Sequence, residues 1–232
     1  MRTPSRHFKR CKPESKQSVK KIRLTQCHAV VIGAGAIGRA VAILLASIGI
    51  KHMSIYDPAI VTRKDLAQGF MDFDVGMAKV DAVANIAHQQ NPRMEILTYR
   101  GRFGRPHLQK LQSGLDNAVF LCVDSITARK SIWNRIKHAA HFLCDGRLGA
   151  EVIRVLASER SSTDTYYQST FLPSKRSSMN KYSCDLVTAT IAVGFMVTQF
   201  SRWLRYIPII PDQVFNLLAH ELFLLEARNG IH

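Results

Sequence analysis

Three glycines lie close together at a spacing that suits phosphate binding. Gly33, Gly35 and Gly38 form the pattern Gly-x-Gly-x-x-Gly, between a β-branched run and an apolar run rich in helix formers. The first glycine of such a turn permits a tight bend, the second lets phosphate approach the backbone, and the third lets the helix pack closely. Free N–H groups at the helix start attract phosphate oxygens. The turn therefore predicts a nucleotide site, with a purely structural glycine turn as the alternative.

A carboxylate follows the turn at the distance expected for a ribose contact. Asp57 comes 19 residues after Gly38, at the end of a second predicted strand. A carboxylate at that place commonly accepts hydrogen bonds from the ribose hydroxyls. The alternative is a turn-forming Asp-Pro step with Pro58. Taken alone, the turn and Asp57 favour NAD as the cofactor.

Alternating strands and helices are needed to hold these residues at one edge of a sheet, and the sequence predicts them. A strand is expected at 27–32 and a helix at 40–48, on either side of the glycine turn. The other expected elements of this part are strands at 51–56, 94–99, 118–123 and 141–144 and helices at 75–90, 106–113 and 127–139. This order predicts an α/β fold with a Rossmann-like, mostly parallel sheet and helices on both faces. The loops after Ile32, Tyr56 and Val123 should then line one crevice.

The pattern changes after Gly149, where an extension of the sheet or a second lobe is expected. The predicted elements there are strands at 152–157 and 166–172 and two C-terminal apolar helices at 186–204 and 212–226. The longest uncharged run, from 186 to 201, has 16 residues, among them three Thr, one Gln and one Gly. This run is too short and too polar for a membrane span.

The positive charge is concentrated at the N-terminus. The 232 residues carry a net charge of +15, and residues 1–24 account for +8, since nine Lys or Arg stand against Glu14 alone. This segment is poor in apolar residues, so the sequence predicts a flexible basic arm at 1–24 and one folded domain at 25–232. With Phe8 as its one aromatic residue, the arm offers no stacking platform for sequence-specific nucleic-acid binding. It also lacks the apolar stretch of a secretory signal, and we expect a cytoplasmic protein that does not enter membranes.

The five cysteines argue against a disulfide framework or a zinc clamp. Their number is odd and no C-x-x-C pair occurs. Cys122 and Cys144 lie in apolar runs and are predicted to be buried, whereas Cys184 stands in a polar stretch just before a long apolar helix. Helix N–H groups would acidify that thiol, while Asp185 would oppose its ionisation. Cys184 is therefore a candidate nucleophile, with a packing role as the alternative.

Several further segments together resemble the ThiF/MoeB/HesA family, the relatives of ubiquitin-activating enzymes. The matching segments are Asp57-Pro-Ala-Ile-Val, Asp65-Leu-Ala-Gln68-Gly-Phe, Asp74-Val-Gly76-Met-Ala-Lys79-Val-Asp-Ala, Asn91-Pro92 and Val123-Asp124-Ser-Ile-Thr-Ala-Arg129. The likeness extends over about residues 25–205. It implies a homodimer that uses ATP and Mg²⁺ to adenylate the C-terminal glycine carboxylate of a small ubiquitin-like or sulfur-carrier protein.

The resemblance also implies a role for each matching residue. Lys79 corresponds to a lysine that contacts phosphate, and its alternative role is that of a solvated helix lysine. Asp124 resembles a carboxylate that holds Mg²⁺, and its alternative role is the N-cap of a helix that starts near Ile126. Cys184 resembles a cysteine of the sulfur-transfer branch, so the expected catalytic residues are Lys79, Asp124 and Cys184. The expected ATP-binding residues are Gly33, Gly35, Gly38, Asp57, Asp65, Gln68 and Lys79.

The sequence departs from the family pattern at one charged position. The family's Asn-Leu-x-Arg-Gln segment reads Asp65-Leu-Ala-Gln68-Gly69 here, so the arginine that contacts phosphate is absent. The usual pair of C-x-x-C zinc motifs is absent too. Either Gln68 suffices or another cation substitutes for the arginine. The candidate cations are Arg63, Lys64 and the arm residues Arg6, Arg10 and Arg23, which could reach across a dimer.

Two other classes of function stay open. A carrier-binding subunit that keeps the fold but has lost activity would explain the missing arginine. A nicotinamide-dependent oxidoreductase would use Asp57, but the chain has no Tyr-x-x-x-Lys or histidine arrangement that suggests a proton donor for hydride transfer.

Overall fold

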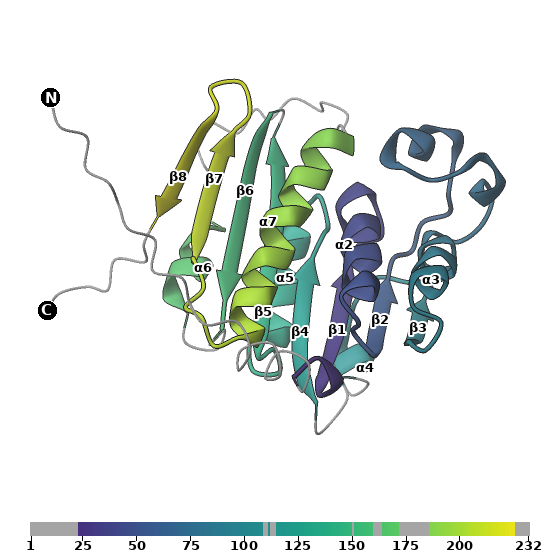
Figure 1. Ribbon diagram of the computed structural model, residues 1–232, viewed down its shortest axis with the longest axis horizontal. Helices are drawn as coiled ribbons and strands as arrows, with labels where there is room; N and C mark the ends of the chain where they lie inside the picture. The colour runs from purple at the N-terminus through teal and green to yellow at the C-terminus, as the bar shows by residue number, and fades with distance from the viewer. Residues whose placement is uncertain are drawn as a thin grey trace, which may run out of the picture.

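One eight-stranded sheet with helices on both faces runs through the part of the chain that the structure describes (Figure 1). The computed structural model describes residues 23–108, 111, 115–149, 151–159, 164–171 and 186–225. The strands are β1 (Cys27–Ile32), β2 (His52–Tyr56), β3 (Glu95–Tyr99), β4 (Asp116–Leu121), β5 (Phe142–Gly149), β6 (Val152–Ser158), β7 (Asp212–Asn216) and β8 (Glu221–Leu225). The helices are α2 (Ala36–Ser47), α3 (Lys79–Gln90), α4 (Arg105–Leu108), α5 (Ile126–Ile136), α6 (Thr165–Ser169) and α7 (Leu186–Leu204), with the 3₁₀ helices η1 (Arg63–Gln68) and η2 (Asp72–Asp74).

The sheet is parallel in its first half and antiparallel in its second. The strand order is β3-β2-β1-β4-β5-β6-β7-β8. Neighbouring strands from β3 to β5 are parallel, and those from β5 to β8 are antiparallel. The expected α/β class, with a mostly parallel sheet that further strands extend, is confirmed.

The register of the parallel strands brings three loops to one edge of the sheet. Ile32 at the end of β1 pairs with Tyr56 at the end of β2 and with Leu121 at the end of β4. The strand order also reverses at β1, because β2 and β3 lie on one side of it and β4 and β5 on the other. Open parallel sheets bind ligands at such a switch point, beyond the carboxyl ends of the strands. The expectation that these loops meet at one edge is confirmed, although β4 ends two residues before Val123.

Each face of the sheet carries its own hydrophobic core. Figure 1 shows α2 and α7 in front of the sheet and α5 behind it. Val31 of β1 belongs to the front core with Leu45 of α2, whereas Val30 belongs to the rear core with Trp133 of α5. Neighbouring strand residues point to opposite faces, and both faces of β1 are covered. This explains why the strand that precedes the glycine turn is apolar at almost every position.

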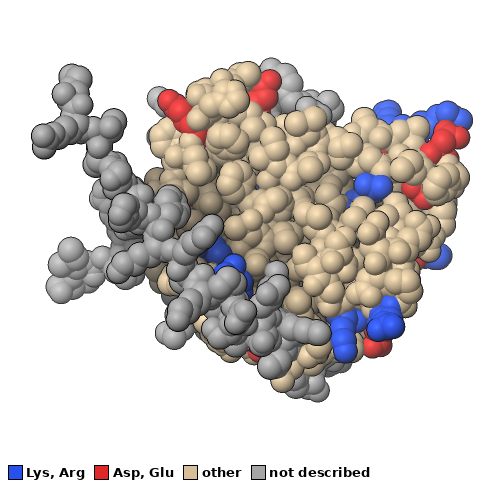
Figure 2. Space-filling model, viewed as in Figure 1, with Lys and Arg blue, Asp and Glu red and all other residues tan. Residues whose placement is uncertain are grey.

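The uncharged run near the C-terminus forms α7, which packs across the front of the sheet. Its inner residues are buried, whereas Thr190, Gly194 and Thr198 are exposed and carry no charge. Figure 2 accordingly shows few charged side chains on the surface above α2 and α7. Among the described helices, α7 included, none combines the length and the apolar character that crossing a membrane requires.

The second predicted C-terminal helix, at 212–226, is wrong, because residues 212–225 form the hairpin of β7 and β8. Asp212 is fully buried and accepts two hydrogen bonds from Arg154 of β6, at 3.0 and 2.7 Å. The Asn216 side chain accepts hydrogen bonds from two backbone N–H groups of the turn. Pairing with β6 therefore decides the conformation of a segment whose apolar residues also fit a helical spacing.

The predicted strand at 166–172 is also wrong, since α6 occupies this place. Asp164 is the N-cap of α6, and its side chain accepts a 2.7 Å hydrogen bond from the backbone N–H of Tyr167. The Tyr167 ring is buried edge-on against Trp133, with 4.7 Å between the ring centres. An N-cap followed by a buried aromatic residue is a helix signal that the alternation of polar and apolar residues concealed.

Four helices have bounds that differ from the prediction. The helix expected at 127–139 is α5, which ends at Ile136. The helix expected at 75–90 begins only at Lys79, since Gly76 has φ +93° and lies in a turn. The helix expected at 40–48 begins earlier, at Ala36, directly after Gly35, so the third glycine of the motif lies in the helix. Of the helix expected at 106–113 the structure describes α4, which ends at Leu108.

The last two residues of the predicted arm belong to the folded domain. Leu24 is buried in the front core, and the Arg23 guanidinium lies 3.3 Å from Asp116 and 4.0 Å from the centre of the Trp203 ring. Residues 1–22, with Arg6 and Arg10, lie outside the described residues. Arg23 and Leu24 therefore pack with the folded residues that follow them.

The cysteines in the described part of the chain are buried. Cys27, Cys122 and Cys144 are free thiols in the core, which confirms the expectation for the last two. Burial raises the pKa of Cys27 and of Cys122 to about 12, and it raises the pKa of Cys144 well above its usual value. Buried neutral thiols are poor nucleophiles. Cys184 lies outside the described residues.

Candidate functional site

The glycine turn is packed against the neighbouring strand and cannot accept side chains at two of its three glycines. Gly33 has φ +97°, and a Cβ there would lie 2.5 Å from the Cys122 carbonyl oxygen. A Cβ at Gly38 would overlap the Gly33 carbonyl oxygen. A Cβ at Gly35 would meet only the Gln68 side chain, at 3.5 Å from its Oε1. The first and third glycines therefore close the turn, and the second leaves the backbone accessible beneath Gln68.

Asp57 connects the end of β2 to this turn. Its Oδ2 accepts a 2.8 Å hydrogen bond from the backbone N–H of Ala34, and its Oδ1 accepts a 2.7 Å bond from the N–H of Ala59. The second contact is the local turn that the Asp-Pro alternative predicted, and the first ties the carboxylate to the glycine segment. Asp57 is partly exposed, so the lone pairs that remain on its oxygens can reach a ligand.

The segment between β2 and α3 carries a buried ion pair. The Lys79 ammonium lies 2.5 Å from Asp65 Oδ1, and the two side chains are 11% and 9% exposed. Asp65 Oδ2 accepts 2.8 Å hydrogen bonds from both the backbone N–H and the hydroxyl of Thr62. Although burial raises the pKa of Asp65, the hydrogen bonds from Lys79 and Thr62 outweigh burial and lower that pKa. Lys79 is thus not a solvated helix lysine, because an ionised partner fixes its position.

The same segment places Gln68 over the glycine turn. Gln68 is the last residue of η1, the 3₁₀ helix that also carries Asp65, and its side chain is the nearest neighbour of Gly35. Backbone hydrogen bonds from Val61 to Met77 and from Lys79 to Ala59 close the base of the segment. The structure therefore brings Gln68, Asp65 and Lys79 together as one unit beside the turn.

Asp124 lies at the same edge of the sheet, after β4. It is exposed, and the N-cap of α5 is the next residue, Ser125, whose hydroxyl accepts a 3.3 Å bond from Ala128 N–H. The alternative role of Asp124 as the N-cap is therefore wrong. The backbone of Cys122, two residues before Asp124, packs against Gly33. Asp124 therefore follows closely on a segment that contacts the glycine turn.

The residues at this edge fit a magnesium ion that a nucleotide helps to bind. Mg²⁺ prefers oxygen ligands and is commonly held by one or two carboxylates together with phosphates and water. Asp124 offers one such carboxylate, because Ser125 and not Asp124 accepts the hydrogen bond that caps α5. The described residues contain no cluster of three or more metal-binding side chains. The carboxylate of Asp124 thus fits Mg²⁺ in company with phosphate.

The structure separates the candidate replacements for the missing arginine. Arg63 is 81% exposed and pairs with Asp72 at 3.6 Å, and Lys64 is exposed beside it. Arg23 pairs with Asp116, the first residue of β4 and therefore at the edge opposite the glycine turn. None of these three described residues reaches the turn through a contact in this structure.

A cation that the sequence motifs missed does approach the turn. Arg39 follows the third glycine directly, and its guanidinium lies against Gly69, next to Gln68. The signal in the sequence was a single arginine at the start of an otherwise apolar helix. The Gly-x-Gly-x-x-Gly motif ends at Gly38, so it assigns no role to Arg39.

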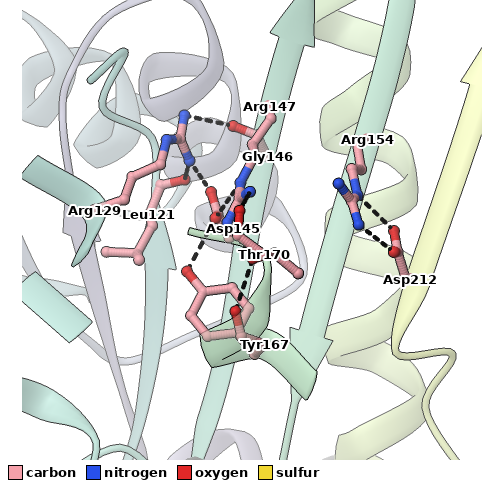
Figure 3. A network of polar contacts seen from close by, with 9 residues as sticks. All are labelled: Leu121, Arg129, Asp145, Gly146, Arg147, Arg154, Tyr167, Thr170 and Asp212. Carbon is pink, nitrogen blue, oxygen red and sulfur yellow. Dashed lines mark hydrogen bonds and ion pairs between the residues drawn. The ribbon is translucent and has the colours of Figure 1, made fainter. Parts of the chain in front are cut away.

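A buried polar network fixes the strand end that precedes Asp124 (Figure 3). Arg129 of α5 donates hydrogen bonds to the carbonyl oxygens of Leu121 and Gly146, at 3.4 and 2.9 Å, and forms an ion pair with Asp145. Burial is the main cause that lowers the pKa of Arg129, to about 10. The final residue of the Val123–Arg129 motif therefore holds β4, β5 and α5 together.

Asp145 joins this network to α6. Besides Arg129, it accepts hydrogen bonds from Arg147 Nε at 2.8 Å and from the Tyr167 hydroxyl at 2.9 Å. Arg147 in turn donates to the carbonyl and hydroxyl oxygens of Thr170. A fully buried carboxylate needs such partners, since an unpaired one is costly. The network thus anchors α6 to the centre of the sheet.

Comparisons with known proteins agree on one family. A model of the ThiF family matches residues 8–213. The SAMP-activating enzyme E1 of Haloferax volcanii is 27% identical over 99 residues, which are 42% of this chain and 37% of that protein. The adenylyltransferase and sulfurtransferase UBA4 of Meyerozyma guilliermondii is 26% identical over 110 residues, 47% of this chain and 26% of that protein. The chain thus spans less than half the length of these curated relatives.

Solved structures show the same fold. A crystal structure of E. coli MccB with MccA-N7isoASN has a TM-score of 0.72 at 13% identity, covering 90% of this chain and 66% of that one. A crystal structure of PaaA has a TM-score of 0.70 at 18% identity, covering 90% of this chain and 75% of that one. The family match extends over most of the sequence, including the glycine turn, Asp57, Lys79 and Asp124. The chain belongs to the ThiF family.

Proposed function

We propose that the protein uses ATP and Mg²⁺ to adenylate the C-terminal glycine of a small ubiquitin-like or sulfur-carrier protein. One observation carries the proposal: the segment with the Lys79–Asp65 pair also places Gln68 over Gly35, so a fixed lysine accompanies the glycine turn. The names of the relatives from Haloferax and Meyerozyma, and a structure of E. coli MccB with ATP, support it.

The chemistry needs positive charge at the phosphates. A carboxylate oxygen of the carrier attacks the α-phosphorus, the bond to pyrophosphate breaks, and an acyl adenylate and pyrophosphate result. Lys79 stabilises the charge that develops on the phosphate oxygens, and Asp57 binds the ribose hydroxyls. Backbone N–H groups of the glycine turn and of α2 bind phosphate. Asp124 would hold Mg²⁺, which supplies further charge neutralisation when bound.

Cys184 would act after adenylation. Its thiolate would attack the carbonyl carbon of the acyl adenylate, forming a carbon–sulfur bond while the bond to AMP breaks. The position of Cys184 ahead of a long apolar helix supports this step. Adenylation itself needs no thiol, so the two steps can be tested separately.

A carrier-binding subunit without activity is the second candidate function. The uncharged Gln68 at the arginine position of the family favours it, because a phosphate contact is lost there. Such a subunit would still bind the carrier but would not exchange pyrophosphate into ATP.

Nucleotide choice is the first test of the proposal. Isothermal titration calorimetry should show that ATP with Mg²⁺ binds in preference to NAD⁺ and NADH, because Lys79 and Asp124 suit a triphosphate with metal. Tighter binding of NAD(H) than of ATP would instead favour the hypothesis of a nicotinamide-dependent oxidoreductase, with which Asp57 is compatible.

A further inference from the structure

Arg39 is a partly buried cation at the glycine turn. It lies in the first part of α2, where its backbone N–H donates a 2.8 Å hydrogen bond to the carbonyl of Gly35. Its side chain reaches the end of η1, since a Cβ at Gly69 would lie 2.8 Å from Nη1 of Arg39 and 3.4 Å from its Cζ. Gly69 has φ +92°, a conformation that favours glycine. The guanidinium therefore occupies space that a side chain at position 69 would need.

Arg39 and Lys79 flank the same aromatic ring. The centre of the Phe70 ring is 5.7 Å from Arg39 Cζ and 5.5 Å from Lys79 Nζ. Both cations arise from helix starts, Arg39 near the start of α2 and Lys79 as the first residue of α3. Two cations near one ring attract an anion with several negative charges.

The charge of Arg39 is incompletely matched by the protein. Lys79 has an ionised partner in Asp65, but Arg39 forms no ion pair with any described carboxylate, and its Nε has no hydrogen-bond partner among the described residues. Burial lowers the pKa of Arg39, while the charge of Asp74 opposes that effect. Because no described carboxylate pairs with it, the positive charge of this guanidinium stays available to an anion.

Solvent and ligands can reach Arg39. It lines an open groove of about 570 Å³, which runs along α2 and α3 away from the glycine turn. The other lining residues include Met71, Phe73 and Asp74 of the segment after η1, and Asn85, Ile86, His88 and Gln89 of the C-terminal half of α3. The guanidinium of Arg39 is therefore open to solvent on one side, whereas Arg129 is buried in the core.

We propose that Arg39 binds the phosphate chain of ATP and supplies the charge that the family's arginine supplies from position 68. The two changes in the Asp65–Gly69 segment fit together: Gln68 removes the positive charge from η1, and Gly69 opens the space through which Arg39 restores it from α2. This inference rests on the proposed function, because it assigns a contact within the same nucleotide site. It also removes the main argument for an inactive subunit.

The test compares nucleotide affinities, so it needs no carrier protein. Isothermal titration calorimetry measures the affinity for ATP·Mg²⁺, and competition measures the affinity for adenosine. The proteins compared are the wild type, Arg39→Ala, Arg39→Gln, the double variant Arg39→Ala/Gln68→Arg and the control Arg63→Ala. We expect Arg39→Ala and Arg39→Gln to weaken ATP binding about 10- to 100-fold, the usual effect of one charge-assisted contact. Adenosine, which lacks phosphate, should bind all variants alike. The double variant should regain most of the affinity, and Arg63→Ala should match the wild type.

Three outcomes would overturn the inference. Equal ATP affinity of Arg39→Gln and wild type would show that Arg39 makes no phosphate contact while leaving the proposed function intact. A loss of ATP and adenosine binding in equal measure, together with a lower melting temperature, would assign Arg39 a role in packing. A wild type that binds no ATP at all would contradict the proposed function as well, which separates that failure from the first two.

Discussion

The ammonium group of Lys79 and the carboxylate of Asp65 face each other at 2.5 Å, largely shielded from water, where the family pattern has asparagine in place of Asp65. The pair keeps Lys79 fixed before any ligand arrives. It also means that phosphate must compete with Asp65 for the charge of Lys79. Because Lys79 is already paired, a second cation such as Arg39 would add to the attraction of the site for phosphate.

Lys79→Ala should cut pyrophosphate–ATP exchange by about 10² to 10³, the usual loss for one preorganised contact to a transition state. The variant leaves Asp65 with only its Thr62 partners, so folding must be checked by the melting temperature. Lys79→Ala/Asp65→Asn removes both charges and serves as the control for folding. Near-normal exchange in a folded double variant would show that Lys79 has been assigned the wrong role.

Asp124→Asn should leave the melting temperature unchanged, because the side chain is exposed, and should reduce exchange by about 10² to 10³. Titration with Mg²⁺ should show a higher metal requirement than in the wild type. Ser125→Ala is the matched control: it should lower stability by about 1 kcal/mol through loss of the N-cap, with no change in the metal requirement. An identical Mg²⁺ dependence in Asp124→Asn and wild type would exclude the metal role.

Cys184→Ser should keep pyrophosphate exchange but lose any thiol-sensitive covalent adduct with the carrier, as seen by intact-mass spectrometry. Cys122→Ser and Cys144→Ser are the comparison variants. These two should lose stability and keep the adduct, since both thiols are buried and their pKa values are raised by burial. An adduct that persists in Cys184→Ser would return this cysteine to a packing role.

Arg129→Ala should lower the free energy of unfolding by about 3 kcal/mol or more, because it removes one partner of a buried ion pair and leaves Asp145 undercompensated. Arg63→Ala breaks an exposed pair and should cost less than about 1 kcal/mol. Urea denaturation of both variants measures the contrast. Equal effects would mean that the network in Figure 3 contributes no more than a surface contact.

Stability should fall below about pH 6.5 because of His28. This residue is fully buried, with its ring nitrogens 3.1 Å from Asn117 and 2.9 Å from Ser54, and burial lowers its pKa from the usual 6.5 despite the Asn117 bond. The unfolded chain then binds more protons than the folded one. The contribution of His28 to the free energy of unfolding is complete above pH 6.5. It is lost as the pH falls below this value, by up to about 1.4 kcal/mol per pH unit.

Thermal or urea unfolding at pH 7.5 and pH 5.0 checks this dependence. His28→Gln should lose less stability between the two pH values than the wild type does, whereas the exposed control His138→Gln should behave as the wild type. The same pH dependence in all three proteins would place its origin elsewhere.

The parallel half of the sheet could be predicted from the sequence because its signals are local. The apolar run ahead of Gly33, the helix after Gly38 and the turn at Asp57 each depend on neighbouring residues. The hairpin at 212–225 could not be predicted in this way, since its apolar residues fit either a helix or a strand. What decides it is Asp212 bound to Arg154, a contact across 58 residues.

The site residues, too, could be predicted only where the signal is local. The type and order of Asp57, Lys79 and Asp124 are visible in the sequence, and the structure places all three at the carboxyl edge of the sheet. Arg39 was missed because it contacts Gly69 from another element, and no local pattern shows that a glycine on one segment makes room for an arginine on another.

Pyrophosphate–ATP exchange by the wild type in the presence of a carrier is the most direct test of the proposed adenylation. The carriers to use are small ubiquitin-like proteins that end in Gly-Gly, first of all any encoded beside this gene. Labelled pyrophosphate should enter ATP only with Mg²⁺ and a carrier whose C-terminal glycine is intact, and removal of this glycine should abolish the exchange. Binding of such a carrier with no exchange above background would contradict adenylation and leave a carrier-binding subunit in its place.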